Sequence, residues 1–80
     1  MTSKTIFVGG IGTFSHQVLE SHFSRFGTVK RTAIKTGYAF ITFESFTQAA
    51  DACDFPFQII GRKKVGLFFP AQNYRLLDRV

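Results

Sequence analysis

Cysteine is almost absent from this sequence of 80 residues, which contains Cys53 alone. A single thiol cannot form a disulfide within the chain, and it cannot supply the ligands of a cysteine-based zinc site. Its neighbours Ala49, Ala50 and Ala52 are small and apolar, so we expect Cys53 to be a small buried thiol with a structural role. Cysteine therefore indicates neither a disulfide framework nor a metal site.

Acidic side chains are also scarce, with five Asp and Glu residues against ten Lys and Arg residues. Five carboxylates leave little from which to build an acid–base pair, and no Ser/His/Asp arrangement stands out. His16 and His22 lie six positions apart, a spacing that does not suit two ligands on one helical face, so both are expected to be structural. We therefore expect no catalytic residue, no metal, no cofactor and no enzyme activity.

Long apolar runs are missing as well. No stretch approaches the roughly 18 apolar residues of a membrane-spanning helix, and the N-terminus has no apolar signal segment. We therefore expect no membrane partner, a soluble protein and a nuclear or cytoplasmic location. The length fits one domain, predicted over residues 1–80 with a core from about 4 to 69 and a C-terminal tail over 70–80.

Positive charge, by contrast, is in excess, with a net charge of +5 and a pI near 9.9. Three of the five acidic residues lie between Glu44 and Gln58, a stretch without Lys or Arg. The basic residues cluster elsewhere, over 30–35 and over 62–64. This segregation favours a one-sided surface that binds a polyanion; a basic surface without a ligand is the alternative.

Strand and helix patterns follow one another in the order βαββαβ. Strands are expected over 6–8, 29–35, 38–43 and 64–69, and helices from the cap Ser15 to Gly27 and from the cap Ser45 to about Cys53. Val18, Leu19 and Phe23 fall on one face of the first helix. A short loop or small hairpin is expected between Pro56 and Gly61. The order predicts an α+β, ferredoxin-like sandwich, a four-stranded antiparallel sheet with two helices on one face.

Alternation along the strands separates two kinds of side chain. Residues 38–43 alternate aromatic or polar with mostly aliphatic side chains, and Phe7 lies between two aliphatic neighbours. Because the aliphatic set must pack against the helices, Phe7, Tyr38 and Phe40 are left on the open face of the sheet. Exposed aromatic rings can stack nucleic-acid bases, at about 1–3 kcal/mol per base. The side chains expected in the core include Leu19, Phe23, Ile41, Phe43 and Ala49.

Two segments resemble the hexamer and octamer motifs of the RNA-recognition motif family. They are I-F-V-G-G-I over 6–11 and T-G-Y-A-F-I-T-F over 36–43. The resemblance extends from about residue 4 to residue 69. Within the family, the sequence loosely resembles the hnRNP A/B, Musashi and DAZ-type branch. It implies RNA processing and binding of single-stranded RNA, with Phe7 and Tyr38 stacking bases and Phe40 packing against sugars. Single-stranded DNA is not distinguished, because the stacking chemistry is shared.

Basic side chains beside the sheet are expected to contact phosphates or base edges. They are Lys4, Arg31, Lys35 and Lys64. The sequence departs from the family at Thr36, where Lys or Arg is usual, and Lys35 is expected to supply that contact instead. The connection between the second and third strands is very short, so we expect little sequence discrimination from it.

The last strand is compatible with two registers. One face would carry Val65, Leu67 and Phe69, and the other Lys64, Gly66 and Phe68. The first set has the composition of a core, which would place Lys64 and Phe68 on the RNA face; the opposite register remains open.

The residues after this strand are expected to extend the site. By the same resemblance, Phe68, Gln72 and Tyr74 would contact bases at one end of the sheet. The alternative is a disordered tail over residues 71–80.

Two other functions are consistent with parts of the sequence. Gly9-Gly10-Ile11-Gly12 partly matches a dinucleotide-binding loop, but Ser15 replaces the third glycine and the chain is too short for that fold, so turn residues are expected. A protein-interaction domain whose sheet face docks a partner peptide or a second copy is the main alternative. Salt dependence separates the two, since RNA binding weakens steeply with salt. The isolated domain is expected to be a monomer.

Overall fold

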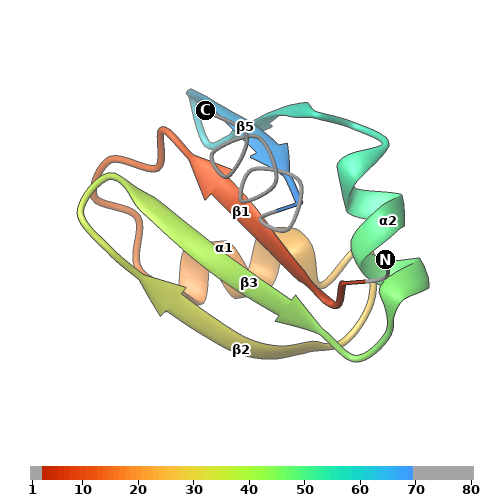
Figure 1. Ribbon diagram of the computed structural model, residues 1–80. Coiled ribbons are helices and arrows are strands. Elements are labelled where there is room, and N and C mark those ends of the chain that lie inside the picture. Colours follow the sequence, from red (N-terminus) through yellow and green to blue (C-terminus); the bar gives the residue numbers. More distant parts are fainter. Residues whose placement is uncertain (1–2, 70–80) are drawn as a thin grey trace, which may run out of the picture.

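The computed structural model describes residues 3–69, which form one sheet and two helices (Figure 1). In chain order the elements are β1 (Thr5–Gly9), α1 (His16–Phe23), β2 (Val29–Ile34), β3 (Tyr38–Phe43), α2 (Phe46–Cys53), β4 (Phe57–Ile60) and β5 (Lys63–Phe68). The strands pair antiparallel in the order β2-β3-β1-β5-β4. Helix α1 lies behind the sheet in the view of Figure 1, and α2 packs against β1, β3 and β5. The predicted ferredoxin-like fold is confirmed.

The sheet differs from the prediction in having five strands rather than four. The additional strand is β4, which forms a hairpin with β5 through the pairs Gln58–Val65 and Ile60–Lys63. Along β4, Gln58 and Ile60 are buried while the residues between them are exposed, which is the period-two pattern of a strand at the margin of a core. The prediction of a short loop or small hairpin between Pro56 and Gly61 is therefore wrong, because the segment is a single strand that pairs with β5.

Both helices begin where the sequence places them. The Ser15 hydroxyl accepts the backbone N–H of Val18, and the Ser45 hydroxyl accepts that of Gln48, each at 3.3 Å. Val18 is 41% exposed, contrary to the expectation that it shares a face with Leu19. Successive helical residues are about 100° apart, so Val18 falls at the margin of the buried stripe. In the part of the chain that the structure describes, no helix has the length and apolar character needed to cross a membrane.

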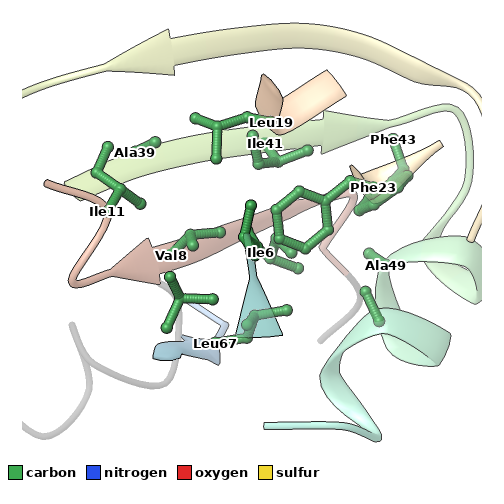
Figure 2. Close-up of a cluster of buried hydrophobic side chains, with 13 residues drawn as sticks. Ile6, Val8, Ile11, Leu19, Phe23, Ala39, Ile41, Phe43, Ala49 and Leu67 are labelled. Atoms are coloured by element: carbon green, nitrogen blue, oxygen red, sulfur yellow. The ribbon is translucent and has the colours of Figure 1, made fainter. Parts of the chain in front are cut away.

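The core lies between the sheet and the helices (Figure 2). Leu19, Phe23, Ile41, Phe43 and Ala49 are buried there as predicted, and the rings of Phe23 and Phe43 meet edge to face at 6.4 Å. Val65 and Leu67 are buried too, which selects the first of the two registers considered for the last strand. Cys53 is partly buried and packs against this core, in agreement with a structural role.

A buried polar network fastens β4 to both helices. The Gln58 side-chain N–H groups donate to the carbonyls of Ala52 at 3.0 Å and Phe55 at 2.9 Å. This orients Oε1 of Gln58 toward His22, whose Nε2–H donates to it at 2.6 Å. His22 is therefore structural, as predicted, and β4 is held at a fixed distance from α1 and from the end of α2.

Candidate nucleic-acid interface

Three aromatic side chains gather on the face of the sheet opposite the core. Phe7 pairs with Phe40 across β1 and β3, and Tyr38 pairs with Gly9. Directly opposed residues of antiparallel strands place their side chains on the same face. We call Phe7, Tyr38 and Phe40 the aromatic triad; the prediction that they lie side by side, away from the helices, is confirmed.

The rings of the aromatic triad contact one another. Phe7 and Tyr38 are stacked, with centroids 5.3 Å apart and planes inclined by 21°. Phe40 meets Phe7 edge-on at 5.7 Å and Tyr38 edge-on at 5.8 Å. These are the offset-stacked and edge-to-face geometries that aromatic pairs prefer. All three side chains are partly exposed, so their packing orders an apolar cluster that still reaches the surface.

Two glycines shape the aromatic triad. A Cβ atom at Gly9 would lie 3.1 Å from Cε1 of Phe7, so the lack of a side chain lets that ring lean over β1 toward Tyr38. Gly37 has a φ of +84°, in the left-handed region that favours glycine. Its carbonyl accepts the backbone N–H of Gly10 at 3.1 Å. The turn before Tyr38 is thereby tied to the end of β1.

One end of the open face is polar. Thr5 and Thr42 form a cross-strand pair whose hydroxyl groups are 2.9 Å apart and hydrogen-bonded. Arg31 of β2 pairs with Thr42 on its other side and is exposed. The sequence-predicted Arg31 thus lies on the same face as the aromatic triad, at the margin of the sheet.

A second predicted cation lies at the opposite end of the triad. Lys35 follows β2, and its backbone N–H donates to the carbonyl of Tyr38 at 2.8 Å. Its side chain is exposed. Arg31 lies within β2 and Lys35 directly after it, so the two cations follow one margin of the aromatic triad.

The other two predicted cations lie farther from the triad. Lys64 is on the open face of β5, but its Nζ is 4.8 Å from the centroid of the Phe57 ring on β4. The carbonyl of Lys4 accepts the backbone N–H of Phe43 at 2.8 Å, a register position that belongs to the helix-facing set. Lys4 is therefore at the end of the sheet rather than over its open face.

Within residues 3–69, the basic side chains at these positions form no ion pair with an acidic side chain. Unpaired surface cations attract phosphate through screened electrostatics and lose counterions when they bind it.

Three predicted site residues lie at or beyond the last described strand. The Cα atom of Phe68 pairs with that of Phe7 across β5 and β1. Gln72 and Tyr74 lie outside the described residues. The role of all three in binding stays a prediction.

The Cys53 thiol has low reactivity. Burial, together with the nearby Asp54 carboxylate, raises the pKa of the Cys53 thiol to about 11. The thiol is therefore protonated near neutral pH and is a poor nucleophile or ligand. Within the described part of the chain, no group of three or more His, Cys, Asp or Glu side chains is placed to hold a metal ion.

A second group of exposed apolar side chains was not predicted as a site. Phe55, Phe57 and Ile59 are 59%, 69% and 60% exposed, on and just before β4. They border an open pocket of about 360 Å³ that also includes Phe26 and Arg25. The alternation of F-Q-I-I between Pro56 and Gly61 is the sequence signal that could have identified this strand and its outward set.

Comparison with known proteins places these features in context. The family model described as RNA recognition motif matches residues 6–66. A curated relative, serine/arginine-rich splicing factor RS31A of Arabidopsis thaliana, is 54% identical over 37 residues, which are 46% of this chain and 15% of that protein. This chain thus corresponds to a small part of the length of that relative.

Solved structures have the same fold. The Nab3-RRM, described in connection with cis element recognition of non-polyadenylated RNAs, is 25% identical with a TM-score of 0.73, over 81% of this chain and 91% of that one. The RNA15 RRM has a TM-score of 0.78 at 19% identity, covering 86% and 91% of the two chains. The Mip6 RRM3 domain has a TM-score of 0.76 at 18% identity, covering 85% and 93%. The latter two show likeness of fold alone.

Proposed function

The chain belongs to the RNA recognition motif family, and from that premise we propose that it binds single-stranded RNA on the open face of its sheet. Members of this family bind RNA rather than catalyse a reaction, so the expectation of a binding domain and not an enzyme is confirmed by the family match. The observation that carries the proposal is the aromatic triad, whose rings pack together on the face that the core does not use.

The mechanism is binding by stacking and charge. Phe7 and Tyr38 present nearly parallel rings, inclined by 21°, and each stacks one of two successive bases. Phe40 stands edge-on to both rings and packs against the sugars between those bases. The Thr5–Thr42 hydroxyl pair and the Arg31 guanidinium group lie beside the triad, where they face the RNA as it leaves the aromatic rings.

The binding energy expected from these contacts is modest. Two or three stacks at about 1–3 kcal/mol each, together with a few phosphate contacts, are offset by the cost of ordering the RNA. Micromolar affinity corresponds to about −8 kcal/mol, and we expect the domain to bind a few nucleotides near that value. Lys35 and Thr36 are the side chains that the short β2–β3 connection offers, so sequence selectivity is expected to be low.

The wider role follows from the curated relative. That protein is named a splicing factor, and we propose that this chain acts in RNA processing, in the nucleus, as one RNA-binding domain over residues 1–80. A longer protein with further domains would add the selectivity that a single domain lacks.

Titration of a fluorescent, randomised pool of single-stranded RNA tests the proposal directly. Binding should be micromolar near physiological salt and should weaken as the salt concentration rises, by about 0.7 in the logarithmic slope for each phosphate contacted. A duplex RNA of the same length is the control, because its stacked bases cannot reach the aromatic triad. The proposal would be contradicted if the duplex bound as tightly as the single strand, or if the affinity did not change with salt concentration.

A further inference from the structure

The outer edge of the sheet has an apolar surface with no part in the proposed RNA mechanism. We call Phe26, Phe55, Phe57, Ile59 and the adjoining Arg25 the β4 edge surface. Its pocket of about 360 Å³ opens between the end of α1 and strand β4. Three of its members are more than half exposed. A contiguous cluster of exposed apolar side chains is typical of an interaction site.

The backbone of β4 is able to pair with another strand. Among residues 3–69, β4 is the outermost strand of the sheet on its side. The N–H of Leu67 donates to the carbonyl of Pro56 at 2.8 Å, which sets the alternation of the hairpin. It follows that the backbone N–H and C=O groups of Gln58 point toward β5, whereas those of Phe57 and Ile59 point outward from the sheet. An outward row of amides flanked by apolar side chains is a template for β-strand addition.

The β4 edge surface is already ordered. Gln58 accepts a hydrogen bond from His22 and donates to two carbonyls, and these bonds hold the strand in place. The rings of Phe26 and Phe55 pack together with centroids 6.2 Å apart. A preformed edge loses little conformational freedom when a partner binds, so even a short contact can be productive.

Charge indicates the chemistry of the partner. Arg25 borders the pocket, and the ammonium group of Lys64 lies over the ring of Phe57. Within residues 3–69 the pocket is lined by no acidic side chain; Asp54, the neighbour of Phe55 in sequence, is not among its lining residues. Acidic side chains on a partner would meet these two cations, whereas basic ones would be repelled.

We propose that the β4 edge surface binds an extended segment of another protein, in which apolar residues alternate with acidic ones, as a sixth strand beside β4. The apolar side chains of that segment enter the pocket beside Phe55 and Ile59, and its backbone pairs with the outward amides of β4. A protein fits better than RNA because the aliphatic Ile59 and a row of amide groups match a peptide backbone rather than a base.

Selection from a phage-displayed library of random 12-residue peptides against the 80-residue chain tests this site. Enriched peptides should alternate apolar with Asp or Glu residues. Added to the ¹⁵N-labelled protein, they should shift the backbone amide resonances of Phe57 and Ile59 and leave those of Tyr38 in place. No enrichment, enrichment of basic peptides, or shifts centred on the aromatic triad would each overturn the proposal.

Three variants separate the backbone contact from the side-chain contact. Phe57→Ser removes a ring. Ile59→Pro removes one outward backbone N–H, and because that N–H does not bond to β5, the β4–β5 hairpin loses no hydrogen bond. Each variant should lower the affinity for the selected peptides by about tenfold or more. Ile59→Val is the matched control and should change affinity by less than about threefold. Amide spectra of each variant without peptide verify that the fold is retained, and full affinity in both Phe57→Ser and Ile59→Pro would overturn the proposal.

Two other occupants give distinct results. Sedimentation equilibrium that shows a dimer of the wild-type chain, abolished by Ile59→Pro, would assign the edge to a second copy of this chain. A loss of single-stranded RNA affinity in Phe57→Ser as large as in Phe7→Ala would make the edge part of the RNA-binding surface. Either result would overturn the protein-segment proposal, and the second would leave the proposed RNA binding intact.

Discussion

The aromatic triad and the β4 edge surface are both rich in phenylalanine, yet their rings are held differently. Each ring of the triad packs against the other two at 5.3–5.8 Å and is partly buried. On the β4 edge surface, by contrast, Phe57 is 69% exposed and lies beneath the Lys64 ammonium group. A ring that other rings orient offers a fixed plane to a base. A ring beside a free strand edge and an isoleucine offers apolar contact to a peptide.

Both surfaces rest on one core, and Phe43→Ala should damage both. Phe43 is buried and meets Phe23 edge to face. Large-to-small replacement of such a ring costs about 3–5 kcal/mol, because it leaves a cavity. Urea denaturation should show this loss in the free energy of unfolding, with RNA and peptide binding falling in parallel. Tyr38→Ala, on the same strand but the other face, is the control and should change stability far less.

The buried network under β4 should matter to one surface more than the other. Gln58→Ala removes the partner of the His22 N–H and of the Phe55 carbonyl, whereas the Ala52 carbonyl still accepts the backbone N–H of Phe55 at 3.1 Å. A buried group left unsatisfied costs about 1–3 kcal/mol, so we expect a loss of about 2–3 kcal/mol in the free energy of unfolding. Hydrogen exchange should accelerate first in β4 and β5.

The matched control for that network is Gln17→Ala, an exposed position on α1, which should cost less than about 0.5 kcal/mol. At temperatures where Gln58→Ala is still folded, its RNA affinity should stay near that of the wild type. Equal acceleration of exchange in β3 would show that the two surfaces are not separable.

RNA affinity gives the sharpest distinction between the surfaces. Phe7→Ala and Tyr38→Ala each remove a stacking ring, at about 1–3 kcal/mol per base, or roughly 5- to 150-fold in affinity. Phe57→Ala removes a more exposed ring on β4 and should change RNA affinity by less than about twofold. Fluorescence anisotropy with single-stranded RNA measures all three, and thermal melts should remain cooperative. Wild-type affinity in both triad variants would assign the open face to a protein partner.

The difference in predictability between the two surfaces has a physical origin. The triad follows from alternation, because the aliphatic side chains around Phe7 and within 38–43 must face the helices, which leaves the aromatic ones outside. The same rule located the buried side of β5 only when pairing with β1 was known, since both of its faces carry apolar residues. The network of His22 and Gln58 joins residues 36 positions apart, and no local pattern reports such a contact.

The β4 edge surface was harder to predict for a related reason. Its strand has four residues, which is too short for periodicity to be read with certainty, and it lies between a proline and a glycine that are typical of loops. Its pocket needs Phe26, which the sequence placed inside a helix ending at Gly27, whereas α1 ends at Phe23 and Phe26 lies in the turn that follows. Exposed surfaces that combine distant elements depend on tertiary packing rather than on local pattern.

Salt dependence tests which surface each cation serves. Arg31→Ala and Lys35→Ala should each lower the logarithmic salt slope of RNA binding by about 0.7, because each removes one phosphate contact. Lys64→Ala should lower it by less, since that ammonium group lies over Phe57. Titrations at several salt concentrations, with one RNA, provide the slopes. If neither Arg31→Ala nor Lys35→Ala changes the slope, the basic margin beside the triad has been assigned wrongly.

The smallest effect is expected from Tyr38→Phe, and it tests how the triad reads RNA. Within residues 3–69 the Tyr38 hydroxyl forms no hydrogen bond, and the ring is oriented by its contacts with Phe7 and Phe40. If stacking alone carries binding, removal of the hydroxyl should change RNA affinity by less than about twofold. Tyr38→Leu keeps an apolar side chain but removes the ring, and it should weaken binding about as much as Tyr38→Ala. A tenfold loss in Tyr38→Phe would instead mean that the hydroxyl donates to a base edge. The triad would then select bases as well as stack them, and it would differ from the β4 edge surface in specificity as well as in ring packing.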